Sequence, residues 1–123
     1  MSEKKIGKKE WIIADGYLPA KSNGDFVSHE AICVLNVGQE DATIDIIFYF
    51  EDRPPMKGFQ EVCPAERTYH IRLDKITDDK GNKLPVDVPY AAKVNSDQPI
   101  VVQHSRMDTS QKELSLMTTI AYS

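Results

Sequence analysis

An imidazole, a guanidinium and a carboxylate follow one apolar run near the end of the chain. The run covers residues 100–102, and His104, Arg106 and Asp108 come shortly after it. Such a run belongs inside a β-sheet, so the three polar side chains should lie at one end of that sheet. Together they can hold hydroxyls or an anionic group by charge-assisted hydrogen bonds. We therefore predict a polar binding site here, with His104 and Arg106 as its first candidates.

A second polar segment precedes an apolar strand. His29 and Glu30 lead into it, and one loop joins it to an earlier strand that ends near Asp15 and Tyr17. If these two strands are paired, all four residues lie at one end of the sheet. Tyr17 and the upstream Trp11 offer aromatic faces suited to sugars or planar ligands. For Trp11, packing in the core or at an interface is an equally good interpretation.

Two other interpretations use the same residues. In the first, His104 and Arg106 form a buried ion-pair network with Glu30 or Asp108 that fixes the end of the fold or a subunit interface. In the second, His29, Glu30 and His104 hold a divalent metal ion with a water in the open position, as in a metal-dependent enzyme. The sequence lacks a compact motif such as HExxH, and Arg106 would place a positive charge near the ion. We therefore expect a protein that is not an enzyme and that has no cofactor or resident metal.

The size and composition of the chain predict one domain. It has 123 residues, of which 41% are apolar and 28% charged. A chain of this length buries roughly two-thirds of its unfolded surface and forms one core. The start is rich in lysine, so we expect a flexible basic tail over residues 1–10 and a single β-sandwich domain over residues 11–123.

Charge and hydropathy limit where the protein works and what it binds. No apolar run approaches the roughly 18 residues needed to cross a bilayer, and no secretory h-region follows the lysine-rich start. We therefore expect a soluble, cytoplasmic protein. The net charge of −4 argues against a general nucleic-acid-binding surface.

The apolar period is two, which is typical of half-buried β-strands. It is clearest over residues 42–50, where apolar and polar side chains alternate. The expected strands lie near 11–14, 26–37, 42–50, 58–62, 67–73, 91–95, 100–107 and 116–122. Turn-forming groups separate them, and residues 75–89 should form a long loop. This spacing favours an all-β fold, an antiparallel β-sandwich of about eight strands.

Six segments, which span nearly the whole chain, resemble the Anabaena sensory rhodopsin transducer family. They are WIIADGYLP at 11–19, FVSHE at 26–30, LNVGQEDA at 35–42, RTYHIRL at 67–73, PIVVQHSRMD at 99–108 and TTIAY at 118–122. The resemblance implies a small soluble β-sandwich that forms a homotetramer and has no enzyme activity. It further implies an architecture similar to that of carbohydrate-binding sandwiches. In its namesake the partner is the cytoplasmic face of a microbial sensory rhodopsin.

These observations lead to one functional prediction. We expect a non-enzymatic, transducer-like protein for signalling or ligand binding, with a membrane sensor or rhodopsin as partner and a carbohydrate-like small molecule as ligand. Nucleic acid is not an expected partner. The residues predicted to bind the ligand or partner are Trp11, Asp15, Tyr17, His29, Glu30, His104, Arg106 and Asp108.

Overall fold

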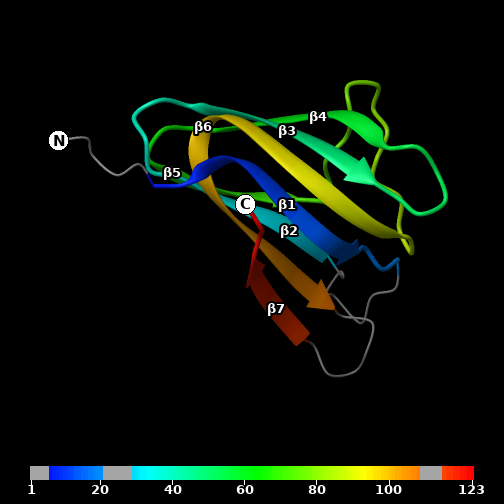
Figure 1. The fold of residues 1–123 in the computed structure, drawn as a ribbon. Coiled ribbons are helices and arrows are strands. Elements are labelled where there is room, and N and C mark those ends of the chain that lie inside the picture. Colours follow the sequence, from blue (N-terminus) through cyan, green and yellow to red (C-terminus); the bar gives the residue numbers. More distant parts are fainter. Residues whose placement is uncertain (1–5, 21–28, 109–114) are drawn as a thin grey trace.

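Seven antiparallel β-strands build the fold over the part of the chain that the structure describes (Figure 1). The computed structural model describes residues 6–20, 29–108 and 115–123, and these contain no helix that would reach across a bilayer. In chain order the strands are β1 (Lys8–Tyr17), β2 (His29–Asn36), β3 (Ala42–Tyr49), β4 (Met56–Cys63), β5 (Arg67–Arg72), β6 (Pro89–Asp108) and β7 (Ser115–Ile120). The all-β prediction is confirmed.

The long strand β6 belongs to both halves of the fold. Its first half pairs with β1 and β3, and its second half pairs with β2 and β7. The strand order is β4-β3-β6-β2-β5, so the architecture is one curled seven-stranded sheet (Figure 1). The strands predicted separately at 91–95 and 100–107 are therefore one strand, which corrects the expected number from about eight to seven. The backbone stays extended through residues 96–99, which lie between the two expected strands.

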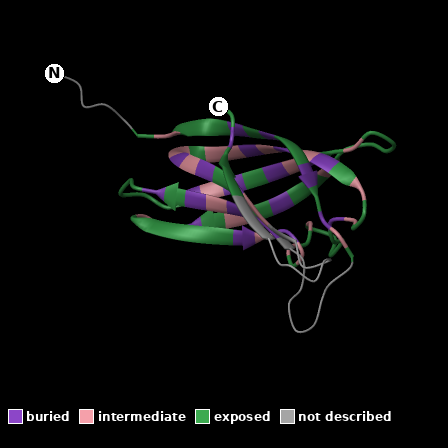
Figure 2. Cartoon of the chain, turned by 90° about the horizontal axis from the view of Figure 1, so that it is seen from below, coloured by how far each residue is buried: buried purple, intermediate pink, exposed green. Residues whose placement is uncertain are grey.

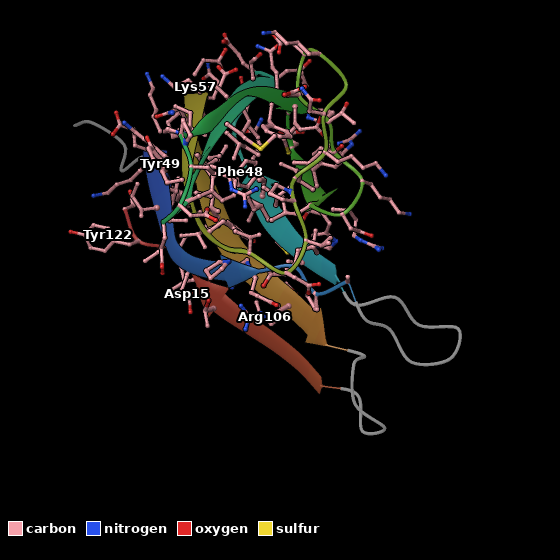
Figure 3. The ribbon with its side chains drawn as sticks, turned by 90° about the vertical axis from the view of Figure 1, so that its right-hand side faces the viewer. Asp15, Phe48, Tyr49, Lys57, Arg106 and Tyr122 are labelled. Atoms are coloured by element: carbon pink, nitrogen blue, oxygen red, sulfur yellow. The ribbon has the colours of Figure 1, made fainter. Side chains whose placement is uncertain are left out.

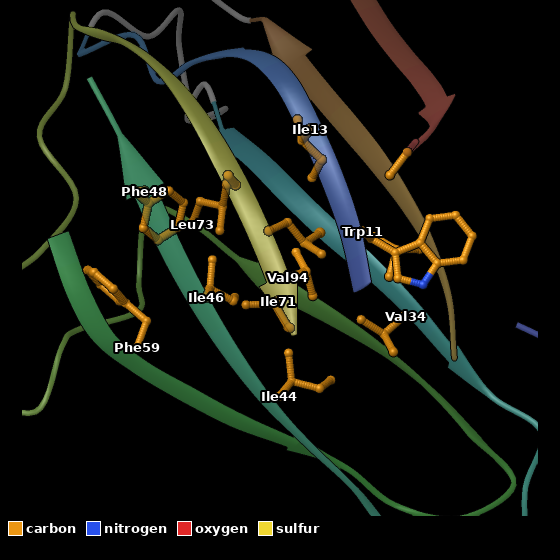
Figure 4. Close-up of a cluster of buried hydrophobic side chains, with 14 of the residues drawn as sticks. Trp11, Ile13, Val34, Ile44, Ile46, Phe48, Phe59, Ile71, Leu73 and Val94 are labelled. Atoms are coloured by element: carbon orange, nitrogen blue, oxygen red, sulfur yellow. The ribbon is translucent and has the colours of Figure 1, made fainter. Parts of the chain in front are cut away.

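The core lies inside the curl. Along β3 every second residue is buried, as the period of two predicted. Figure 2 shows this alternation of buried and exposed residues along the strands. Figure 4 shows how apolar side chains from both halves meet. The fully covered members of this core include Ile32, Ile44, Ile46, Phe48, Cys63, Ile71, Leu73, Val94, Ile100 and Val102.

The structured part of the chain begins before residue 11, where the sequence analysis placed the start of the domain. The strand β1 begins at Lys8, which pairs with Ile100, so residues 8–10 of the expected tail lie in a strand. Residues 1–5 are outside the described part of the chain.

The long loop expected over residues 75–89 is present, since no strand lies between Arg72 and Pro89. It is anchored by the buried side chain of Leu84 and by a turn in which Asp78 accepts hydrogen bonds from backbone amides.

One glycine allows β1 to approach a core tyrosine. The pairing of β1 with β6 shifts register between Ile13 and Gly16, and Gly16 then lies against the Tyr90 ring. A Cβ atom at Gly16 would stand 2.2 Å from the Cζ atom of Tyr90. Because the Tyr90 side chain is buried, it has little room to move aside.

Replacement of this glycine should therefore destabilise the fold. We expect Gly16→Ala to lower the free energy of unfolding by about 1–3 kcal/mol, which is typical of overpacking. Urea denaturation followed by tryptophan fluorescence measures the change. The control is Glu10→Ala, at an exposed position of the same strand, which should change the free energy of unfolding by no more than about 0.5 kcal/mol. A stability of Gly16→Ala equal to that of the wild type would contradict the close approach of β1 to Tyr90.

Candidate functional site

The centre of the candidate site is the carboxylate of Glu30, whose side chain is completely buried. It accepts hydrogen bonds from the Tyr90 hydroxyl at 2.5 Å, the Arg106 Nε at 2.6 Å and the Tyr17 backbone amide at 3.0 Å. The His104 Nε2 atom lies 3.5 Å from the same carboxylate. A buried charge is tolerated only when it is paired and hydrogen-bonded, and Glu30 satisfies both conditions. We call Tyr17, Glu30, Tyr90, His104 and Arg106 the Glu30 network.

Strand register explains how this network forms. In the β2–β6 ladder Glu30 is directly opposite Arg106, and Ile32 is opposite His104. Residues two apart on a strand share a face, so His104 and Arg106 point to the same side as Glu30. Tyr90 lies in the other half of β6 and is brought to Glu30 by the curl of the sheet. Three strands, β1, β2 and β6, are thus tied together by one carboxylate.

The electrostatics fix the protonation of Glu30 and Tyr90. Burial by itself raises the pKa of Glu30, but hydrogen bonds from His104, Tyr90 and Arg106 outweigh burial and lower that pKa below its ordinary value. Burial, together with the adjacent charge of Glu30, raises the pKa of Tyr90 far above its ordinary value. Glu30 is therefore a carboxylate at neutral pH, and Tyr90 is a neutral hydrogen-bond donor.

The lowered pKa of Glu30 predicts a dependence of stability on pH. As the pH falls, the unfolded chain takes up this proton before the folded chain does, so folding loses free energy. The stabilisation is complete above the ordinary glutamate value of 4.5 and is lost as the pH falls through the lower folded-state pKa. We expect the wild type to lose stability more steeply below that pH than Glu30→Gln, as measured by urea denaturation at a series of pH values. Equal slopes for the two proteins would contradict the shift.

A small pocket opens beside the Glu30 network. Its volume is about 180 Å³, and it is lined by Asp15, His104, Arg106 and Thr119. We call it the polar pocket. Thr119 lies on β7 directly opposite His104, while Asp15 comes from β1. The pocket thus collects side chains from three strands.

The polar pocket presents hydrogen-bonding groups that the described residues leave unused. Arg106 is held through its Nε atom, and its two terminal nitrogens make no hydrogen bond to any residue in the described part of the chain. Asp15 is exposed and, within the same part, makes no hydrogen bond or ion pair. Figure 3 shows Asp15 and Arg106 on the same side of the molecule. Anchored donors beside an acceptor suit a ligand that carries hydroxyl groups.

The structure brings together four of the residues predicted from the sequence. Asp15, Glu30, His104 and Arg106 meet at the polar pocket or directly behind it. The ion-pair network weighed as an alternative is present for Glu30 with Arg106. The polar pocket lies beside that network, because His104 and Arg106 belong to both.

The two aromatic residues predicted to bind the ligand, Trp11 and Tyr17, do not line the polar pocket. The Trp11 side chain is 7% exposed and belongs to the core, where its Nε1 atom donates to the carbonyl oxygen of Ile100 at 3.0 Å. Tyr17 contributes its backbone amide to the Glu30 network, while its hydroxyl donates to Asp87 at 3.2 Å. Neither aromatic ring lines the polar pocket.

For two further candidates only the backbone is described. His29 pairs with Met107, and Asp108 pairs with Ser115, so both residues lie at the same end of the sheet as Glu30 and Arg106. Their side chains are outside the described part of the structure. Their role in binding, including a shared site for the imidazoles of His29 and His104, stays a prediction.

The site also contains residues that sequence reasoning missed. Tyr90 lies between the loop expected over residues 75–89 and the strand expected near 91–95, and Thr119 lies in the strand expected near 116–122. The inward position of Tyr90 follows from the period of two, since Ala92 and Val94 are also buried. Its hydrogen bond to Glu30 has no signal in the sequence, because the two residues are 60 positions apart.

The metal-site alternative finds no support. Among the described residues no group of three side chains is suited to hold a metal ion. Within that part, the Glu30 carboxylate is directed at the hydroxyl of Tyr90 and the guanidinium of Arg106, both of which are hydrogen-bond donors. A donor set that includes an arginine opposes a bound cation.

One family model and two solved structures are similar to this chain over most of its length. A family model described as Anabaena sensory rhodopsin transducer matches residues 6–123. A solved structure, "Crystal Structure of Thermotoga maritima 1070", is 38% identical, covers 94% of each chain and has a TM-score of 0.85. Another, "Anabaena sensory rhodopsin transducer", is 39% identical, covers 83% of this chain and 99% of its own, and has a TM-score of 0.73. No curated protein matches.

Proposed function

Because this chain belongs to the Anabaena sensory rhodopsin transducer family, we propose that it is a non-enzymatic transducer that couples a bound signal to a protein partner. The resemblance seen in the six sequence segments is confirmed by the match of the family model over residues 6–123. A transducer needs a binding site and a contact surface rather than reacting groups. The polar pocket and the exposed apolar side chains of the sheet supply candidates for these two features.

We place the signal-binding site in the polar pocket, and the ligand class is a carbohydrate-like small molecule. The observation that carries this assignment is the anchored guanidinium of Arg106 beside the carboxylate of Asp15, which makes no hydrogen bond or ion pair with the residues that the structure describes. A hydroxyl donates to a carboxylate and accepts from a guanidinium, so neighbouring hydroxyls satisfy both groups. Arg106 needs no reorganisation, because Glu30 already fixes its Nε atom.

For the partner we propose a membrane sensor of the rhodopsin type, bound in the cytoplasm by a homotetramer of this chain. The 39% identity to the protein named as the Anabaena sensory rhodopsin transducer supports this proposal. Exposed apolar side chains supply surface for such contacts. Ile120 and Tyr122 near the C-terminus are 67% and 76% exposed, and Ile12 pairs with Tyr122 through backbone hydrogen bonds. Large exposed apolar side chains in a group mark interaction surfaces.

Ligand binding can be tested by thermal shift with glucose, maltose and myo-inositol as probes. We expect at least one probe to raise the Tm of the wild type, since a ligand of the native state stabilises it. The rise should be lost in Asp15→Asn and retained in Asp45→Asn, which changes an exposed carboxylate on β3. A wild type insensitive to all three probes, or a rise that survives Asp15→Asn, would overturn the assignment of the polar pocket.

The partner proposal has a separate test. The protein is mixed with a sensory rhodopsin in detergent micelles and analysed by size-exclusion chromatography with light scattering. We expect the free protein to elute with the mass of four chains and to co-elute with the rhodopsin. The double variant Ile120→Ser, Tyr122→Ser should reduce this association. Separate elution of the wild type and the rhodopsin would refute the rhodopsin partner, and a monomer mass would refute the tetramer.

A further inference from the structure

A second pocket lies next to the polar pocket, between the ends of β1 and β3 and the start of β6. Its volume is about 230 Å³, and its aromatic lining consists of Tyr49, Phe50 and Tyr90. The lining also contains two acidic residues, Asp15 and Glu51. We call it the aromatic pocket. Asp15 is the one residue that lines both pockets.

From this lining we propose that the aromatic pocket binds an organic ammonium ion, which neither the proposed transducer role nor the polar pocket requires. The lining contains two carboxylates and no lysine, arginine or histidine. Within the described part of the chain, neither Asp15 nor Glu51 makes a hydrogen bond or an ion pair. A hollow whose lining carries charge of only one sign attracts a ligand of the opposite sign.

The aromatic rings decide which kind of cation fits. The face of an aromatic ring attracts a cation, and combined rings and carboxylates are suited to alkylammonium groups. The chain already shows this attraction, because the Arg53 guanidinium carbon lies 5.5 Å from the centre of the Phe50 ring. Arg53 itself is paired with Asp52 at 3.0 Å and does not line the pocket.

An inorganic cation is a poorer match for the same lining. Mg²⁺ and Ca²⁺ require six or more oxygen ligands at short distance. The rest of the aromatic pocket is formed by Ala14, Pro89 and Ala91, whose side chains are apolar. Apolar walls pack against the methyl or methylene groups of an alkylammonium ion and exclude a hydrated metal ion.

Asp15 lines both pockets, but a cationic side chain, that of Arg106, accompanies it only in the polar pocket's lining, together with His104 and Thr119. Figure 3 shows Tyr49, Asp15 and Arg106 following one another along the side of the molecule that carries β1. The charge of Asp15 is partly offset by Arg106 on the side of the polar pocket. Glu51 has no such neighbour in the lining of either pocket. The carboxylate of Glu51 is therefore the principal partner of the ammonium group.

The test is a titration of the ¹⁵N-labelled full chain with choline, putrescine and Nα-acetyl-lysine methylamide, followed by amide chemical shifts at constant ionic strength. We expect shift changes at Ala14, Glu51 and Ala91 that sodium chloride does not produce. Tighter binding of choline would identify a free quaternary ion as the natural source. Tighter binding of the lysine derivative would identify a lysine side chain of a protein partner. Putrescine represents small primary amines.

Variants make this test specific for the aromatic pocket. Glu51→Gln should weaken binding of the best probe about tenfold, as expected for loss of one charge-assisted contact. Tyr49→Leu, which changes an exposed ring, should weaken it about threefold. Glu10→Gln, at an exposed position of β1, is the matched control and should bind like the wild type.

Two outcomes would overturn the proposal. One is the absence of shift changes beyond those caused by sodium chloride, and the other is equal binding by the wild type and Glu51→Gln. Because Glu51 does not line the polar pocket, Glu51→Gln should keep the thermal response to the carbohydrate-like probes. Failure of the ammonium site and failure of the proposed ligand site therefore give different results.

Discussion

Replacement of Glu30 by alanine is expected to lower the free energy of unfolding by about 2–4 kcal/mol, because the buried Tyr90 hydroxyl loses its acceptor while the Arg106 guanidinium, whose side chain is 35% exposed, is partly hydrated. The variant leaves the Arg106 guanidinium and the Tyr90 hydroxyl without their shared acceptor. It also deprives the Tyr17 amide of its hydrogen bond. Urea denaturation at pH 7, fitted with a common m-value, measures the loss.

A control and a double-variant cycle make the Glu30 prediction specific. Glu10→Ala, at an exposed position of β1, should change the same free energy by no more than about 0.5 kcal/mol. In the cycle with Arg106→Ala, the loss for the double variant should be clearly smaller than the sum of the single losses, because the two residues share one contact. Additive losses, or a loss below about 1 kcal/mol for Glu30→Ala, would contradict a structural role of the network.

Phe48→Ala should have an effect of similar size, about 3–5 kcal/mol of unfolding free energy. The Phe48 ring is completely buried and lies beside Phe59 in the core (Figure 4). Its centre lies 4.9 Å from that of Phe59 and 5.5 Å from that of Tyr90. Its removal leaves a cavity and also takes away the support of the Tyr90 ring. We therefore expect Phe48→Ala to weaken ligand binding in both pockets as well, since Tyr90 lines one and hydrogen-bonds Glu30 behind the other.

The neighbouring position supplies the control for this prediction. Tyr49 follows Phe48 on β3 but points away from the core and is 41% exposed. Tyr49→Ala should cost much less stability than Phe48→Ala in the same denaturation experiment. Equal losses for the two variants would mean that β3 does not present Phe48 to the core in the register observed here.

The fold could be predicted from the sequence where one face of a strand is buried. In β3 the alternation from Ala42 to Phe48 is complete, so both strand type and inward face were read correctly. The expectation of two separate strands, near 91–95 and 100–107, was wrong. Residues 96–99 include Ser, Asp and Pro, which are residue types that favour turns. Here the strand continues through them, and the Asp97 carboxylate accepts a hydrogen bond from the Thr43 amide of β3 at 2.8 Å. This contact depends on tertiary structure and has no local signal.

The candidate site was predicted in part, for a related reason. His104, Arg106 and Glu30 were found because charged groups at the end of an apolar strand are unusual. Tyr90 was missed because its contact with Glu30 depends on the curl of β6, which no pattern in the sequence specifies. Trp11 was open to two interpretations, since an aromatic residue in a strand suits either a core or a ligand face. Its position in the core is settled by neighbours distant in the sequence, including Ile100.

The most direct test of the central claim, that an ionised Glu30 holds the site together, is the pKa of its carboxyl group measured by ¹³C NMR across a pH titration. We predict a pKa below the ordinary glutamate value, because the hydrogen bonds from His104, Tyr90 and Arg106 outweigh burial. The shift should reverse in Arg106→Gln, since burial then acts against a weaker set of donors. A pKa above the ordinary value in the wild type would mean that burial dominates, and it would contradict the arrangement of the site described here.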